Sequence, residues 1–319
     1  MQLRPLGSTD LMVSGLGLGT MTWGARTSYD DAAQMLRTFV DAGGNLIDSA
    51  AAYGRGEVES LIGRMLARTV RRSSLVIATK AGFVQRDGAR LIDNSVASLI
   101  SDLEGSLRRL GTDWIDLWQI HAWDEAHFAD TLEAAEIALT RGLVRQVGVS
   151  NYVGWQVAEM AGWQQASGHR PIACAQAEYS LLARRAELEL LPCLRHLQMG
   201  FIAWSSLGRG VLTGKYQRAR PSGSRAADPA MSWFVEPYLD DPANRLVAAT
   251  AYAAQGLGLT TAQVAHLWAR DAPGVTACLV GPRDVSQLVP LLETDQIALP
   301  PEITAALDDI SGGPDAGRD

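Results

Sequence analysis

The sequence has 319 residues, of which 47% are hydrophobic and 20% are charged. This balance supports a sizeable hydrophobic core and excludes a disordered chain. The net charge of −7, without a long run of Lys or Arg, excludes general attraction to nucleic-acid phosphates.

The predicted elements begin with a short β-hairpin over residues 2–5 and 11–14, followed by a repeated unit of apolar strand, polar loop and amphipathic helix. The expected strands cover residues 16–20, 45–49, 75–79, 115–120, 144–150, 173–178, 200–205 and 277–281. The expected helices cover residues 32–41, 57–68, 94–109, 124–141, 154–167, 184–198, 244–255 and 261–270. Asn94 is the expected N-cap of the third helix.

Eight strands that alternate with helices predict an α/β fold, namely a (β/α)8 TIM barrel with an N-terminal β-hairpin. The competing doubly wound sheet normally carries G-x-G-x-x-G after its first strand, whereas this chain reads GTMTWG. Residues 208–240, after strand seven, are rich in Gly, Arg, Pro and Ser, and we expect them to form a long cofactor and substrate loop. A single domain over residues 1–311 and a flexible tail over residues 312–319 are predicted.

Three scattered cysteines predict neither a disulfide framework nor a metal site. The first residues, MQLRPLGSTD, lack the apolar stretch of a signal peptide. No run of about 18 apolar residues is present. The sequence therefore predicts a cytoplasmic protein without a membrane or nucleic-acid partner.

Four chemically different side chains stand at or just after adjacent strand ends: Asp48, Tyr53, Lys80 and His121. Each alone has a structural interpretation, such as a helix cap or a packing residue. Together they predict a catalytic site, in which the Lys80 ammonium lowers the pKa of the Tyr53 phenol and Asp48 holds the ammonium. His121 would orient a carbonyl oxygen above this general acid. No side chain supplies hydride, so a nicotinamide cofactor is required.

These residues lie in segments that resemble the aldo-keto reductase family over nearly the whole chain. The matching segments are LRPLGSTDLMVSGLGLGTMTWG, NLIDSAAAYGRGEVESLIG, VIATK, IDLWQIH, VGVSN, AQAEYSLL, WSSLGRGVLTGKY and GPRDVSQL. The resemblance implies a bacterial-type reductase with the four side chains as its catalytic tetrad and Tyr53 as the acid. The cofactor loop is similar to the family branch that includes the β subunits of potassium channels.

The resemblance also implies that NADP(H) binds across the barrel mouth. It puts Ser150, Asn151 and Gln176 at the nicotinamide amide, Trp204 beneath the ring, and Arg283 at a 2′-phosphate that NAD lacks. The expected cofactor residues are Thr20, Met21, Asp48, Ser150, Asn151, Gln176, Trp204, Ser205, Leu207, Gly208, Gly210, Lys215, Arg225, Gly281, Arg283 and Gln287. Many relatives place an Asn shortly after this Gln. This chain reads LVPL there, so weaker adenine contacts are expected.

The predicted function is NADPH-dependent reduction of an aldehyde or ketone to an alcohol. The alternatives are a sugar (keto-hexose) ketoreductase of a biosynthetic pathway and a cofactor-binding regulatory subunit resembling the channel β subunits. Those subunits place Asn where His121 stands, which favours an enzyme. The expected partner is a small carbonyl substrate, and the chain is expected to be a monomer or a homo-oligomer. Aromatic loop residues predict a pocket for flat, apolar carbonyl compounds: Trp23, Trp123, Trp233, Phe234 and Tyr238.

Overall fold

The computed structural model describes residues 1–313, in which eight parallel strands form a closed barrel in the order β10-β11-β12-β3-β4-β5-β8-β9. The strands are β3 (Leu16–Gly19), β4 (Leu46–Asp48), β5 (Val76–Ala81), β8 (Ile115–Ile120), β9 (Val144–Ser150), β10 (Cys174–Glu178), β11 (Gly200–Trp204) and β12 (Ala277–Val280). All eight expected strands are present, and the predicted barrel is confirmed.

The strands are apolar because they are covered on both faces. Most of the strands contribute residues to two different hydrophobic clusters. Leu46, Val76, Leu117 and Ile202 belong to the smaller cluster, to which no helix contributes and which therefore fills the barrel interior. The intervening strand residues pack with the helices in the larger cluster.

The predicted N-terminal hairpin is also present, as β1 (Leu3–Pro5) and β2 (Met12–Ser14). Leu6 and Val13 belong to the interior cluster, so the hairpin closes the end of the barrel where the strands begin. Gly7 is required at its turn, because its φ is +61° and a Cβ atom there would lie 2.6 Å from the backbone nitrogen of Gly200.

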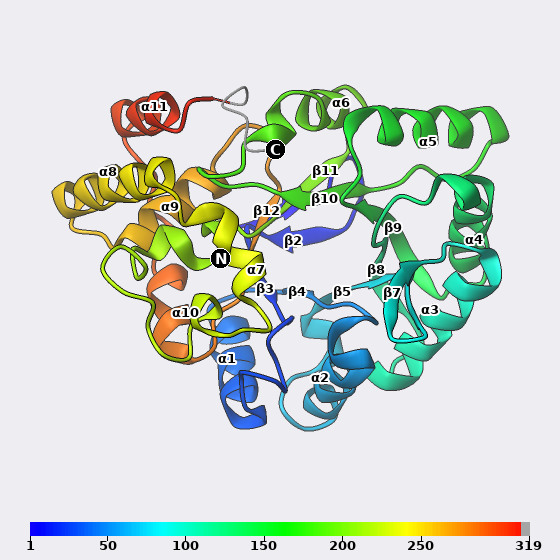
Figure 1. Ribbon diagram of the computed structural model, residues 1–319. Helices are drawn as coiled ribbons and strands as arrows, with labels where there is room; N and C mark the ends of the chain where they lie inside the picture. The colour runs from blue at the N-terminus through cyan, green and yellow to red at the C-terminus, as the bar shows by residue number, and fades with distance from the viewer. Residues whose placement is uncertain (314–319) are drawn as a thin grey trace.

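Helices surround the barrel (Figure 1). They are α1 (Tyr29–Asp41), α2 (Glu57–Arg68), α3 (Val96–Leu110), α4 (Phe128–Thr140), α5 (Gly154–Ser167), α6 (Leu190–His196), α8 (Asp241–Leu257), α9 (Thr261–Arg270), α10 (Val285–Leu292) and α11 (Pro301–Ile310). The expected cap of α3 was wrong: Ser95 accepts the hydrogen bond from the Ser98 backbone, whereas Asn94 is buried and donates to the Ala122 carbonyl. Within residues 1–313, no helix is both long and apolar enough to cross a membrane.

The sequence reasoning missed a second hairpin, β6 (Phe83–Arg86) and β7 (Ala89–Ile92), which follows β5 directly. Its turn is Asp87-Gly88, with φ values of 53° and 79°. An Asp-Gly pair with both φ values positive is the usual two-residue hairpin turn. The hairpin is short and mostly exposed, so no apolar run marks it.

The expected long loop after β11 contains short elements of its own. It forms short helical turns: η5 (Gly208–Thr213), η6 (Arg225–Ala227), α7 (Ser232–Val235) and η7 (Glu236–Tyr238). Phe234 of α7 lines the same cavity as Tyr53 and His121, so the segment does lie at the barrel mouth. Most of the expected tail, residues 314–319, lies outside the described residues.

Candidate active site

The four side chains expected to form a catalytic site come together at the ends of three neighbouring strands. Asp48 is the last residue of β4, Lys80 lies near the end of β5, and His121 directly follows β8. Tyr53 begins the 3-10 turn η1 (Tyr53–Gly56), which follows β4. Since β4, β5 and β8 are adjacent in the barrel, their ends place these groups side by side.

Lys80 and Asp48 form a buried ion pair. The Lys80 Nζ donates to Asp48 Oδ2 at 2.5 Å and to the Ser49 carbonyl at 2.9 Å. Only 1% of Lys80 is exposed. Burial alone would lower the pKa of Lys80, but Asp48 and Tyr53 together raise it above its ordinary value. The ammonium therefore stays charged inside the protein.

The second carboxylate oxygen of Asp48 is held by two glutamines. Gln176 Nε2 donates to Oδ1 at 2.8 Å and Gln119 Nε2 donates at 3.2 Å. Gln176 Nε2 also donates to Gln119 Oε1 at 3.1 Å. Both oxygens of Asp48 are therefore fixed. Gln119 was missed by the sequence reasoning, because a polar residue in the middle of a buried strand gives no sign of which side chain it will meet.

Tyr53 is a half-buried phenol beside the Lys80 ammonium, whose Nζ lies 5.4 Å from the centre of its ring. Burial raises the pKa of Tyr53, and Asp48 adds to this, while Lys80 and Arg90 act in the opposite direction. The net pKa is raised, so the expected lowering by Lys80 is outweighed by burial. The phenol is protonated at neutral pH and has a proton to give.

His121 is held as a neutral imidazole. Burial, followed by the charges of Lys80 and Arg90, lowers the pKa of His121 well below its ordinary value. The Phe83 ring packs against His121 at 4.6 Å between ring centres. The backbone N–H of His121 donates to the Ala81 carbonyl at 2.9 Å, which fixes the residue against β5. A neutral ring can donate one hydrogen bond to a ligand oxygen.

These groups lie in a cavity of about 680 Å³ at the barrel mouth. Tyr53 and His121 line it on the side of β4, β5 and β8. Lys215, Arg225 and Arg283 line it on the side of β11 and β12. The cavity is thus shared by a proton-donating group and a group of cations.

Lys215, Arg225 and Arg283 have no carboxylate partner among residues 1–313. Arg225 Nη1 donates to the Arg209 carbonyl at 3.2 Å and Arg283 Nη1 donates to the Gly223 carbonyl at 2.5 Å. Burial, followed by Arg225 and Arg283, lowers the pKa of Lys215 to about 8. Cations without carboxylate partners, with guanidinium groups held by backbone carbonyls, are suited to bind the phosphates of a dinucleotide.

Comparison with known proteins agrees with this geometry. A model of the aldo/keto reductase family matches residues 15–311. The chain belongs to the aldo/keto reductase family. It is 35% identical to an uncharacterized oxidoreductase, YrpG, of Bacillus subtilis (strain 168), over 98% of this chain and 97% of YrpG. It is 32% identical to the protein tas of Escherichia coli (strain K12) and of Shigella flexneri, over 97% of each chain.

As an aldo/keto reductase the protein is an oxidoreductase, and the family generally uses a nicotinamide cofactor. The expected cofactor residues gather around the cavity. All of them line it except Gly208. Gly208 is buried, and a Cβ atom at this position would lie 2.7 Å from the Leu182 side chain. Trp204 Nε1 donates to Asn151 Oδ1 at 3.1 Å, and Asn151 Nδ2 donates to the His121 carbonyl at 3.0 Å.

Four of the five expected substrate residues do not line this cavity. Trp23 is a core residue with 1% exposure, and Trp233 is exposed at the surface. Trp123 packs against Phe128, Tyr152 and Trp155. Tyr238 is buried outside the cavity, and of the five aromatic residues only Phe234 lines it. The aromatic wall is instead formed by Phe83, Trp204 and Phe234.

Two charged contacts that the sequence did not indicate fix the loops around the cavity. Arg209 makes a bidentate pair with Glu178, with distances of 2.7 and 2.6 Å, and donates to the Phe234 carbonyl at 2.7 Å. Arg26 pairs with Asp228 of the long loop. These contacts join the strand ends to the segment that covers the mouth.

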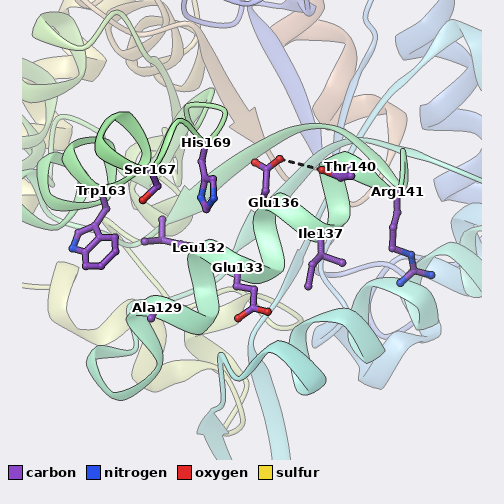
Figure 2. Close-up of a pocket in the computed structure, with 10 residues that line it drawn as sticks. All are labelled: Ala129, Leu132, Glu133, Glu136, Ile137, Thr140, Arg141, Trp163, Ser167 and His169. Atoms are coloured by element: carbon purple, nitrogen blue, oxygen red, sulfur yellow. Dashed lines mark hydrogen bonds between the residues drawn. The ribbon is translucent and has the colours of Figure 1, made fainter.

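A second cavity, of about 660 Å³, lies on the outer surface between α4 and α5 (Figure 2). Its lining comes from α4, the end of α5 and His169, and none of the expected site residues lines it. Glu136 and Thr140 are hydrogen-bonded to each other there at 3.0 Å. Within residues 1–313, no group of three or more His, Cys, Asp or Glu side chains is placed to hold a metal ion.

Proposed function

We propose that this protein reduces an aldehyde or ketone to an alcohol, with NADPH as the hydride source and Tyr53 as the proton donor. The observation that carries the proposal is the composition of one cavity. It holds a half-buried, protonated phenol beside an ammonium on one side and three uncompensated cations on the other. The family membership supports the same reaction class.

Tyr53 gives its proton to the substrate oxygen. When bound, NADPH would supply the hydride that the carbonyl carbon accepts, which no side chain can do. As negative charge develops on the carbonyl oxygen, the phenol transfers its proton and becomes a phenolate. Lys80 stabilises that phenolate electrostatically, and Asp48 keeps Lys80 charged.

His121 orients the same oxygen. A neutral imidazole that lines the cavity can donate one hydrogen bond to the carbonyl oxygen, and this bond strengthens as the oxygen gains charge. Phe83 packs against the ring and limits its rotation. The site thus has two hydrogen-bond donors for one oxygen and a single transferable proton.

Two features support a nicotinamide nucleotide with a 2′-phosphate. Gln176 donates its amide hydrogens to Asp48 and Gln119. Its carbonyl oxygen can therefore accept a hydrogen bond from a carboxamide. Arg283 presents a guanidinium group beside Lys215 and Arg225. A phosphate dianion would pair with this group, whereas the ribose hydroxyl of NADH would leave it uncompensated.

The test is titration of the protein with NADPH and NADH, followed by tryptophan fluorescence, and then a carbonyl substrate screen. We expect tight quenching by NADPH, a weaker response to NADH, and carbonyl-dependent oxidation of NADPH. Tyr53→Phe should abolish turnover by removing the proton, yet leave NADPH affinity nearly unchanged. Tyr252→Phe, on the exposed side of α8, is the matched control.

Turnover by Tyr53→Phe at the wild-type rate would rule out Tyr53 as the acid. No binding of either nucleotide would overturn the cofactor assignment.

A further inference from the structure

The β6–β7 hairpin brings one arginine to the catalytic side of the cavity. Arg90 lies on β7, paired in register with Gln85 on β6. Its guanidinium carbon lies 3.6 Å from the centre of the Phe83 ring, and that ring packs against His121. Arg90 lines the cavity together with Tyr53 and His121. It thus stands beside the position where the substrate oxygen would lie.

Arg90 has no hydrogen bond or ion pair with any residue in 1–313. The other arginine of the hairpin, Arg86, faces the opposite side and pairs with Asp93. The residue as a whole is exposed, and partial burial of its guanidinium lowers the pKa of Arg90. Tyr53 acts in the opposite direction on that pKa, so the phenol and the guanidinium are within electrostatic reach of each other.

The other charges of the cavity are already accounted for. Among the residues that the structure describes, Asp48 is the one acidic residue that lines the cavity, and its oxygens accept from Lys80 and the two glutamines. Arg26 and Arg209 have carboxylate partners in the surrounding loops. The three remaining cations lie on the β11–β12 side, where a dinucleotide would bind. Among residues 1–313, Arg90 is therefore the uncompensated charge on the substrate side.

We propose that Arg90 binds an anionic oxygen group of the carbonyl substrate, and that the preferred substrates are short aldehydes or ketones that carry a carboxylate. This inference rests on the proposed reductase function. A guanidinium already fixed on an aromatic ring offers two parallel N–H donors, which match a carboxylate and also a phosphate. The aromatic wall of Phe83, Trp204 and Phe234 favours a flat group between the carbonyl and the anion.

The experiment compares each carboxybenzaldehyde isomer with its methyl ester, which keeps the shape and removes the charge. Glyceraldehyde phosphate and glyceraldehyde form the corresponding phosphate pair. We expect the best carboxylate to exceed its ester in kcat/KM by about tenfold or more. Arg90→Gln should return this ratio to about one, a fall of about tenfold or more, the usual effect of losing a charge-assisted hydrogen bond.

Arg86→Gln is the matched control, since it removes a positive charge from the other face of the same hairpin and should leave the ratio unchanged. Arg90→Lys keeps the charge but loses the planar fork, and should recover only part of the ratio. A larger preference in the phosphate pair than in the carboxylate pair would overturn the choice of carboxylate. Equal kcat/KM for acid and ester in the wild type would overturn the proposal entirely.

A binding measurement separates this proposal from the reductase function. Benzoate, which has the carboxylate but no reducible carbonyl, is titrated calorimetrically into the wild type, Arg90→Gln and Arg86→Gln. Loss of benzoate binding in Arg90→Gln alone supports the site even if no carbonyl is turned over. Equal benzoate binding by all three proteins refutes it, whatever the activity.

Discussion

Replacing Asp48 by Asn tests the buried ion pair at the centre of the site. The substitution keeps the shape but removes the charge that Lys80 Nζ contacts at 2.5 Å. Lys80 is 1% exposed, so water cannot replace the lost partner. Removing one member of a buried, hydrogen-bonded pair costs about 3–5 kcal/mol of unfolding free energy, because a buried charge is left uncompensated. The pKa of Lys80 should then fall, since burial alone lowers it.

Urea unfolding followed by tryptophan fluorescence measures this loss. The matched variants are Lys80→Met and the double variant Asp48→Asn/Lys80→Met, which contains neither charge. If the pair is coupled as the structure indicates, the double variant should be less destabilised than the sum of the single variants by about 2–3 kcal/mol. Because the folded pKa of Lys80 is raised, the contribution of the pair is complete at neutral pH and is lost only above about pH 10.4.

A loss below about 1 kcal/mol in Asp48→Asn, the size of an ordinary neutral hydrogen bond, would refute this account. So would exact additivity of the two single variants, since it would mean that Asp48 and Lys80 do not act on each other. Either result would also remove the reason for a charged Lys80 beside Tyr53.

Two further predictions concern the cation group and a buried histidine. Arg283→Ala should weaken NADPH binding by about ten- to hundredfold and NADH binding by less than about threefold. Fluorescence quenching measures both affinities, and Arg37→Ala is the exposed control. Equal weakening of both nucleotides would remove Arg283 from the 2′-phosphate site. Burial, with Arg270 adding, lowers the pKa of His266 to about 3, so the unfolded chain binds a proton that the folded protein does not. The free energy of unfolding should therefore fall by up to about 2 kcal/mol for this group between about pH 6.5 and pH 5. His266→Met should remove this share of the slope in urea unfolding curves and leave the share due to His121, and an unchanged slope would contradict the assignment.

The barrel could be predicted from the sequence because its determinants are local. Each strand is a short apolar run, the runs recur with one spacing, and strands buried on both faces leave little room for another assignment. The grouping of the four candidate side chains followed from the same logic, since Asp48, Lys80 and His121 stand at or beside the ends of three such runs. A side chain at the end of a barrel strand lies at the mouth of the barrel, so its position can be inferred from the strand alone.

Residues whose placement depends on tertiary contacts could not be predicted in this way. Trp23 and Phe234 are both aromatic loop residues, yet one is a core residue and the other lines the cavity. Asn94 and Ser95 are both suitable helix N-cap residues. Asn94 donates to the Ala122 carbonyl instead, and Ser95 is the N-cap of α3. The Asp87-Gly88 turn, in contrast, is a local signal for the hairpin that holds Arg90, and the sequence reasoning missed it.

The two sides of the cavity differ in whether their charged side chains have partners of opposite charge. Lys80 is fully paired with Asp48, and this pairing allows an ammonium to remain charged next to a phenol that burial keeps protonated. The cations on the β11–β12 side are unmatched, as expected where charge arrives with a ligand and leaves with it. Arg90 is unmatched in the same way but lies beside Tyr53 and His121, so the same reasoning that assigns phosphates to one side assigns an anionic substrate group to the other.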